Sequence, residues 1–180
     1  MKKSDIRNKI LNIRKKKFDP LKKINFNIIK DFIFNNSVKP VIGGYVPVNY
    51  EIDCLNILKK LENEKIKISL QVIKNNNDME FYRYSFKFPM KINKYGIPEP
   101  FKSKIILPNI LFVPLVAFDD KLYRIGYGGG YYDRYLAKLE KKKLFKSIGF
   151  AFSFQKVNEI PINNFDKKLD LVITENKFYK

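Results

Sequence analysis

The segment from Ile110 to Arg134 constrains the fold more than any other part of the chain. Ile110 to Phe118 is the most apolar run, and a polar connection, the glycine cluster Gly126-Tyr127-Gly128-Gly129-Gly130 and a helical pattern from Tyr131 follow it. In α/β proteins a strand, a glycine-rich loop and a helix in this order build phosphate sites, because loop amides and the helix N-terminus face one anion. The segment therefore predicts a central buried strand followed by an anion-binding turn.

Helical and strand-like patterns alternate along the rest of the chain. Apolar spacing predicts a first helix capped by Ser4 and further helices over 24–33, 51–61 and 131–144. The predicted strands cover 41–46, 66–73, 81–88, 110–118, 148–154 and 169–174, and the proline-rich span 89–108 reads as loop. This alternation indicates an α/β layered fold with a largely parallel central sheet. With 180 residues and no internal repeat, the chain is expected to form one domain over residues 1–180.

The composition excludes several kinds of chemistry. The chain has no histidine and a single cysteine, Cys54, so it lacks a histidine base, a Ser-His or Cys-His nucleophile and a CxxC metal or redox site. Any reaction must use carboxylates, Lys, Arg, Tyr or backbone amides. Cys54 is expected to be a small buried packing residue. No apolar leader or membrane-length run is present, so a cytoplasmic protein without a membrane partner is expected.

The formal charge of +18 raises the question of nucleic-acid binding. Lysines are spread over nearly every segment, with only short runs at 15–17 and 141–143. This distribution favours a solvated basic surface over a nucleic-acid site. The charge also suits anionic small ligands such as nucleotides and polyglutamylated cofactors.

The residues around the glycines distinguish this loop from an ordinary turn. The loop is neither GxxxxGK[ST] nor GxGxxG, so neither a P-loop NTPase nor a dinucleotide site is indicated, and a bare glycine cluster equally suits a turn with positive φ. The flanking residues combine phosphate-binding cations with carboxylates that could hold magnesium. They are Asp119, Asp120, Arg124, Asp133 and Arg134. Asp133 could alternatively complement the dipole of the following helix.

Two stretches resemble the signature of the 5-formyltetrahydrofolate cyclo-ligase family. They are Val113-Pro114-Leu115-Val116-Ala117-Phe118-Asp119 and Arg124-Ile125-Gly126-Tyr127-Gly128-Gly129-Gly130-Tyr131-Tyr132-Asp133-Arg134. The resemblance extends over nearly the whole chain, through Lys3 and Arg7, 45–53, 79–81, 95–100 and 166–174. It implies a three-layer α/β/α fold and the ATP-driven conversion of 5-formyltetrahydrofolate to 5,10-methenyltetrahydrofolate, with release of ADP and phosphate.

The resemblance also implies roles for individual residues. The implied ATP contacts are Lys3, Arg7, Arg124, Ile125, Gly126, Tyr127, Gly128, Gly129, Gly130, Tyr131 and Tyr132. The implied folate contacts are Val46, Glu51, Tyr127, Gly128, Gly129, Gly130 and Tyr131. Asp133 and Asp166 match the magnesium ligands, and Arg124, Tyr131 and Asp133 are the implied catalytic residues. Lys3 and Arg7 lie one helical turn apart, so both can face one anion. By itself, Glu51 would be read as a carboxylate at the start of a helix.

Two positions depart from the family pattern. Phe165 stands where a histidine often precedes the aspartate of the tail, and Gln71 stands where a proline is common.

Two other functions remain open: a non-catalytic nucleotide or phosphate sensor, and a basic nucleic-acid-binding protein. The leading expectation is a monomeric enzyme that uses ATP and Mg²⁺, acts on 5-formyltetrahydrofolate, polyglutamylated or not, and needs no nucleic acid.

Overall fold

The computed structural model describes residues 1–74, 78–101, 103–141 and 145–180. In these residues the helices are α1 (Lys3–Lys17), α2 (Phe26–Asn36), α3 (Leu55–Asn63) and α4 (Tyr131–Glu140), with a short 3₁₀ helix at Ser153–Gln155. The strands are β1 (Val41–Gly44), β2 (Lys67–Ile73), β3 (Met79–Tyr84), β4 (Met90–Ile92), β5 (Pro98–Pro100), β6 (Ile110–Pro114), β7 (Ala117–Phe118), β8 (Arg124–Ile125), β9 (Lys146–Phe150), β10 (Leu171–Ile173) and β11 (Phe178–Tyr179).

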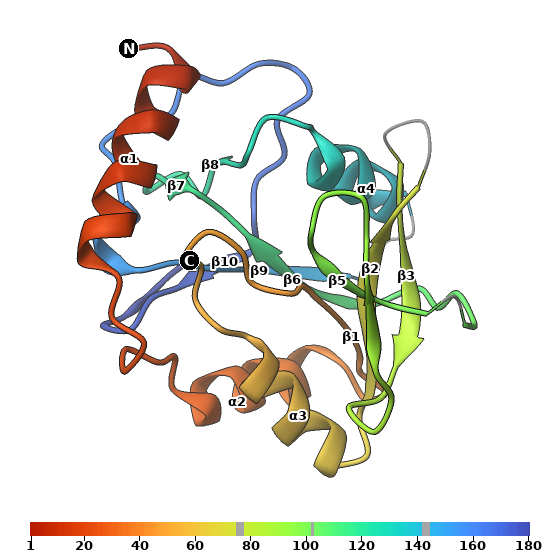
Figure 1. The fold of residues 1–180 in the computed structure, drawn as a ribbon. Helices are drawn as coiled ribbons and strands as arrows, with labels where there is room; N and C mark the ends of the chain where they lie inside the picture. Colours follow the sequence, from red (N-terminus) through yellow and green to blue (C-terminus); the bar gives the residue numbers. More distant parts are fainter. Residues whose placement is uncertain (75–77, 102, 142–144) are drawn as a thin grey trace.

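A seven-stranded sheet forms the middle of the molecule (Figure 1). Its order is β11-β10-β9-β6-β1-β2-β3, and the inner strands β10, β9, β6, β1 and β2 are parallel. β3 and β11 pair antiparallel at the two edges. The predicted α/β fold with a largely parallel sheet is confirmed.

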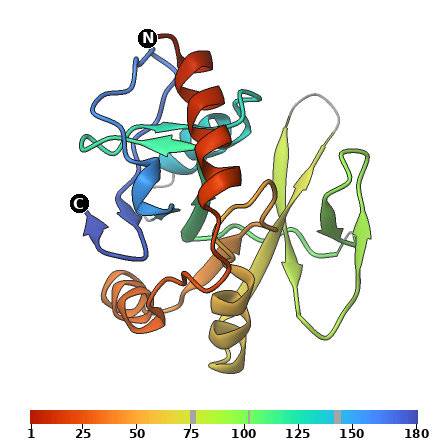
Figure 2. The same ribbon diagram turned by 60° about the vertical axis from the view of Figure 1, so that its left-hand side comes forward.

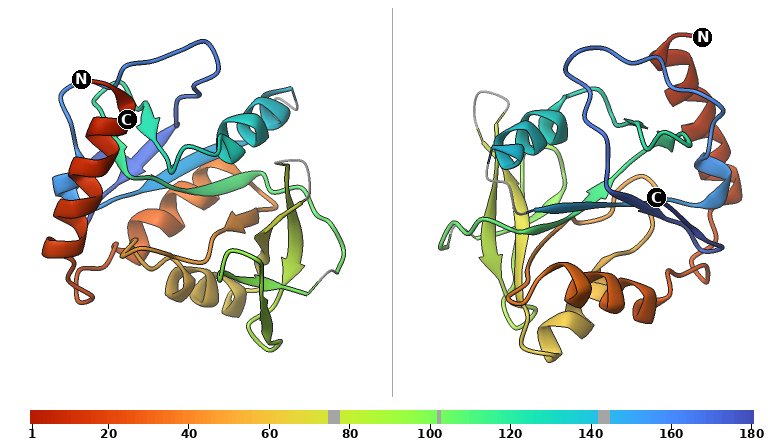
Figure 3. Two further views of the ribbon diagram at one scale, coloured as in Figure 1. Left: turned by 45° about the horizontal axis from the view of Figure 1, so that its top comes forward. Right: turned by 180° about the vertical axis from the view of Figure 1, so that it is seen from behind.

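Helices cover both faces of this sheet (Figure 3). In strand β6, Ile110 and Phe112 belong to the core cluster to which α2 and α3 contribute, whereas Leu111 and Val113 belong to the cluster to which α4 contributes. Side chains of a strand alternate between faces, so a strand buried on both sides reads as a continuous apolar run. This placement explains why Ile110 to Val113 dominated the sequence pattern.

The first helix packs away from the main layers, against the β7–β8 hairpin (Figure 2). Ile6 and Ile10 are buried in a cluster with Val116, Ala117 and Ile125. The helix begins at Lys3, so Ser4 lies inside its first turn and is not the cap that the sequence predicted. The Asp5 carboxylate accepts the N–H of Lys2, the residue that precedes the helix, at 3.1 Å. None of the helices described is both long and apolar enough to cross a bilayer.

The predicted strand over 110–118 is divided in two. β6 ends at Pro114, and β7 belongs to a separate hairpin with β8. Between them the Leu115 carbonyl accepts hydrogen bonds from Arg14 Nη1 at 3.2 Å and Gln155 Nε2 at 2.9 Å. Side chains that are distant in sequence therefore donate hydrogen bonds to the backbone carbonyl at which the sheet ends. A local sequence pattern cannot reveal such a contact.

The predicted helix over 51–61 begins later, at Leu55. Asp53 Oδ1 accepts the Leu55 N–H at 2.8 Å, and Asn49 and Tyr50 have φ of 48° and 63°, which no helix allows. Glu51 is therefore not a carboxylate at the start of a helix. It lies in the loop between β1 and α3.

Several other boundaries differ from the predictions. The strand predicted over 81–88 ends at Tyr84, because a turn closed by the Phe88 N–H to the Ser85 carbonyl follows it. The span 89–108 is not only loop, since it contains the β4–β5 hairpin, whose turn uses Gly96 at φ 74°. The strands predicted over 41–46, 148–154 and 169–174 are shorter, and the second helix begins after Ile24 at Phe26. α4 ends at Glu140, and residues 142–144 lie outside the described part of the chain.

Candidate active site

A cavity of about 1000 Å³ opens beside the carboxyl ends of three parallel strands. Val46 follows β1, Ile73 ends β2 and Pro114 ends β6, and all three line it. Ligands of open α/β sheets bind outside the carboxyl ends of the strands, so this is the expected location. Asp119 and Asp120, which flank the glycine loop in the sequence, do not line this cavity. Every residue for which the family resemblance implied a role does line it: Lys3, Arg7, Val46, Glu51, Arg124, Ile125, Gly126, Tyr127, Gly128, Gly129, Gly130, Tyr131, Tyr132, Asp133 and Asp166.

The glycine loop crosses the cavity between β8 and α4. Gly128 and Gly130 have φ of 105° and 66°, conformations that side-chain-bearing residues rarely adopt. Arg7 Nε donates to the Gly126 carbonyl at 2.8 Å, and Arg134 Nη2 donates to the Gly129 carbonyl at 2.9 Å. Arginines on both sides therefore hold the loop, and Gly130 leads directly into the N-terminus of α4, where an anion is favoured.

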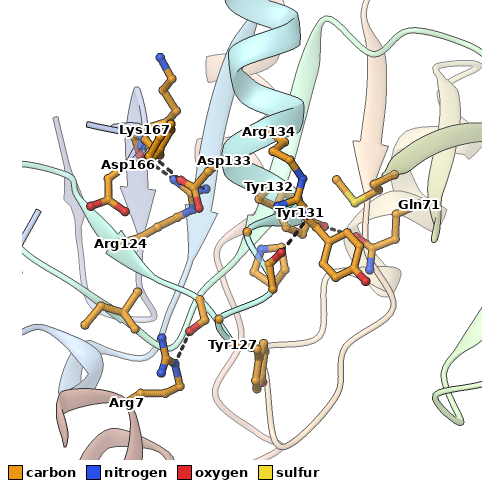
Figure 4. Close-up of a pocket in the computed structure, with 18 of the residues that line it drawn as sticks. Arg7, Gln71, Arg124, Tyr127, Tyr131, Tyr132, Asp133, Arg134, Asp166 and Lys167 are labelled. Atoms are coloured by element: carbon orange, nitrogen blue, oxygen red, sulfur yellow. Dashed lines mark hydrogen bonds and ion pairs between the residues drawn. The ribbon is translucent and has the colours of Figure 1, made fainter. Parts of the chain in front are cut away.

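Carboxylates and cations form two linked pairs on one side of the loop. Arg124 is buried, and its Nη2 contacts Asp133 Oδ1 at 2.9 Å while its Nη1 donates to the Lys167 carbonyl at 2.6 Å. Burial lowers the pKa of the Arg124 guanidinium, and Asp133 opposes this effect. Lys3 Nζ contacts Asp166 Oδ1 at 2.6 Å. Figure 4 shows Arg124, Asp133, Asp166 and Lys167 together on this side, with Gln71 and Tyr131 on the other.

The flanking carboxylate Asp119 has a different role from the one that its position in the sequence suggested. It is 1% exposed and does not line the cavity. Its Oδ1 accepts the N–H groups of Lys121 and Tyr123, both at 3.0 Å, and its Oδ2 accepts that of Ile160 at 3.1 Å. Asp119 therefore ties the β7–β8 turn to the C-terminal segment, and its oxygens are not available to a metal ion.

The opposite wall of the cavity carries a buried carboxyl group. Glu51 is 6% exposed, its Oε2 accepts the Val48 N–H at 2.8 Å, and its Oε1 has no partner within the described residues. Burial raises the pKa of Glu51 from 4.5 to about 7, against the effects of the Val48 N–H, Arg14 and Tyr127. An acid that titrates near neutrality in a cavity is a candidate for ligand recognition.

Some residues at the site were not singled out from the sequence. Gln71, noted only as a departure from the family pattern, lines the cavity and accepts a hydrogen bond from the Tyr132 hydroxyl through Oε1. Arg14 lies behind the wall and donates to the Tyr127 hydroxyl. A signal existed for Arg14, because it follows Arg7 by seven residues and so falls on the same helix face. Phe165 lines the cavity and is 81% exposed.

The chain is similar in sequence to the proteins of one known family. Residues 1–175 match the 5-formyltetrahydrofolate cyclo-ligase family. A 5-formyltetrahydrofolate cyclo-ligase of Haemophilus influenzae is 36% identical over 135 residues, covering 71% of this chain and 72% of that protein. One from Mycoplasma genitalium is 33% identical over 152 residues, covering 84% of this chain and 81% of that protein.

The solved structures agree with these relatives. The solution structure of Aquifex aeolicus 5,10-methenyltetrahydrofolate synthetase superposes with a TM-score of 0.76 at 27% identity, over 100% of this chain and 93% of that chain. A Mycoplasma pneumoniae 5,10-methenyltetrahydrofolate synthetase, 24% identical with a TM-score of 0.74 over 97% and 99% of the two chains, shares the fold. The chain belongs to the 5-formyltetrahydrofolate cyclo-ligase family.

Proposed function

We propose that this enzyme uses ATP and Mg²⁺ to convert 5-formyltetrahydrofolate to 5,10-methenyltetrahydrofolate, with release of ADP and phosphate. The observation that carries the proposal is one cavity with two chemically different sides. The glycine loop, Lys3, Arg7 and Arg124 offer amides and cations to a phosphate chain. Across the loop, Glu51 offers an acceptor to ring N–H groups. A nucleotide and a folate bound together would meet at the loop.

The chemistry requires positioning and charge neutralisation more than a protein nucleophile. The formyl oxygen attacks the γ-phosphorus of ATP, and the bond from that phosphorus to the ADP oxygen breaks. The neighbouring folate nitrogen then attacks the activated formyl carbon and gives up its proton to the phosphate, which leaves with the former formyl oxygen as the ring closes. Arg124 and the loop amides would stabilise the negative charge on the transferred group. A chain without histidine can supply all of these contributions.

The residues present also suit a magnesium ion that binds together with the nucleotide. Asp133 and Asp166 line the cavity with hard oxygen donors, and each forms an ion pair with a cation, Arg124 and Lys3 respectively. No cluster of three acidic, histidine or cysteine side chains able to hold a metal occurs in the described ranges. Magnesium is commonly held by one or two carboxylates plus substrate phosphates. Asp133 and Asp166 would hold it, and its charge would neutralise the phosphates.

The test is a direct assay of the purified protein. ATP, magnesium and 5-formyltetrahydrofolate are mixed with it, and the methenyl product is followed by its absorbance. Product should form only when all three components are present, because carbonyl activation needs the phosphoryl group. Product without nucleotide would contradict the mechanism. ATP binding without turnover would indicate a sensor, and salt-sensitive affinity for DNA or RNA without turnover would indicate a nucleic-acid-binding protein.

A further inference from the structure

A buried arginine and a buried glutamate lie near the folate side of the cavity. Arg14 is 1% exposed and Glu51 is 6% exposed. In the part of the chain that the structure describes, the buried side-chain polar atoms without a hydrogen-bond partner are Arg14 Nε and Glu51 Oε1. Such atoms are costly unless a function retains them. Arg14 also acts electrostatically on Glu51, so the two residues call for a common explanation.

Tyr127 lies between these two residues. Arg14 Nη2 donates to the Tyr127 hydroxyl, and the Arg14 Cζ atom is 5.7 Å from the centre of the Tyr127 ring. Arg14 Nη1 donates to the Leu115 carbonyl at the end of β6. Tyr127 and Glu51 line the cavity, whereas Arg14 does not. Arg14 therefore reaches the site only through other residues.

The Arg14 guanidinium has no carboxylate within ion-pair distance among the described residues. A buried guanidinium in this position is expensive unless a negative charge lies near it. Glu51 supplies that charge when it is ionised, and Arg14 in turn favours the ionised form of Glu51. Helix α1 thus places a fixed cation behind the carboxyl group that faces the folate side.

The other titratable groups around Glu51 do not compensate its charge. Tyr45 and Tyr132 are buried, and burial raises their pKa values, so both stay neutral at physiological pH. Cys54 is also neutral for this reason, and Asp53 adds a like charge nearby. The Tyr127 hydroxyl lowers the pKa of Glu51, although less than Arg14 does. In the described structure, Arg14 is the cation that acts on Glu51.

We propose that Arg14 is a positioning residue of the folate site, which orients the Tyr127 hydroxyl and keeps Glu51 ionised so that it can accept hydrogen bonds from the substrate. This role rests on the proposed function. It also explains why an arginine is buried where it does not line the cavity. It connects α1, the glycine loop and the wall that carries Glu51. Loss of Arg14 should weaken folate binding in a way that higher pH reverses.

The first test needs no substrate. The carboxyl carbon of Glu51 is followed by ¹³C NMR of protein labelled at glutamate, with the signal assigned by Glu51→Gln. Wild-type Glu51 should titrate near pH 7. In Arg14→Met the carboxyl should bind its proton roughly tenfold more tightly, which is one pH unit in the midpoint. Arg14→Lys keeps the charge and should retain the wild-type midpoint. An unchanged midpoint in Arg14→Met would overturn the proposal.

The second test measures the dissociation constant of 5-formyltetrahydrofolate between pH 6 and 9. In Arg14→Met the constant should be roughly fivefold higher at pH 7 and approach the wild-type value by pH 9. A loss of affinity that is the same at every pH would indicate a purely structural role and contradict the proposal. If Arg14→Met does not fold, Tyr127→Phe is used in its place, and it should also raise the pH midpoint of Glu51. An unshifted midpoint in Tyr127→Phe would overturn the proposal. A shifted midpoint in a protein that binds no folate would instead contradict the proposed function.

Discussion

Lys3 and Asp166 meet at 2.6 Å although 163 residues separate them. Lys3 is the first residue of α1, and Asp166 belongs to the C-terminal loop, so their ion pair closes one side of the cavity with the two ends of the chain. The Asn163 N–H also donates to Asp166 Oδ2 at 2.6 Å. The pair brings together a proposed phosphate contact and a proposed metal ligand.

Lys3→Met should raise the KM for ATP about tenfold or more, because one charged hydrogen bond to phosphate contributes about 1.5–3 kcal/mol. Initial rates at varied ATP and saturating folate measure the effect. Lys9→Met is the matched control, since Lys9 is an exposed lysine of the same helix that does not line the cavity. Equal KM values for the two variants would remove Lys3 from the nucleotide site.

Gly128→Ala should destabilise the glycine loop, whereas Gly126→Ala should cost little. Gly128 has φ 105°, and a side chain there costs on the order of 1–3 kcal/mol in strain. A Cβ atom at Gly126 would meet nothing within 4 Å, and its φ lies outside the left-handed region. The free energies of unfolding of both variants, measured with urea, give the comparison. Equal stability would show that the loop relaxes around the added methyl group.

The sequence contained enough local information to predict the layers of the fold. The buried run from Ile110 to Val113 and the helical stripes define which surfaces must pack together, and these features agree with the observed sheet. The end of β6 could not be predicted, because it depends on side chains of Arg14 and Gln155 that arrive from distant segments. Local patterns report periodicity, and long-range hydrogen bonds leave no periodic trace.

In the candidate site, too, some features could be predicted from the sequence and others depend on long-range contacts. The family motifs identified residues that do line one cavity. The sequence could not tell, however, which of the carboxylates near the glycines faces that cavity. Asp133 faces the cavity, while Asp119 is enclosed by backbone N–H groups, one of them 41 residues away at Ile160. Arg14 carried only a weak helical-spacing signal, and its partner Tyr127 lies 113 residues further along the chain.

The stability of the protein should depend on pH through Glu51. Its folded pKa, about 7, is above the ordinary value of 4.5, so the folded state binds more protons between these two values. The unfolding free energy therefore falls as pH rises from 4.5 to 7, by about 3 kcal/mol from this group alone. Glu51→Gln should remove this dependence. Its ATP affinity should stay near wild type while folate affinity falls. Urea unfolding at several pH values measures the first effect, and parallel curves for the two proteins would contradict it.

Asp133 allows the proposed metal role to be separated from a structural one. Its Oδ1 pairs with buried Arg124 and also accepts the Lys167 N–H at 3.2 Å, so the residue does more than complement the dipole of α4. Asp133→Asn should cost about 1–3 kcal/mol of stability, because a hydrogen bond to a charged group is weakened. Asp119→Asn is the matched control. It places an amide N–H against backbone N–H groups and should destabilise the protein by a similar amount, without touching the cavity.

The magnesium dependence of turnover then distinguishes the two variants. An amide oxygen is a poorer ligand for a hard cation than a carboxylate, so folded Asp133→Asn should lose most turnover at limiting magnesium. Excess magnesium should restore part of that turnover, and folate binding should persist throughout. Asp119→Asn, once folded, should show the wild-type magnesium dependence because Asp119 has no oxygen available to a metal. Wild-type turnover of Asp133→Asn at limiting magnesium would make Asp133 a structural residue and leave Asp166 as the proposed carboxylate ligand.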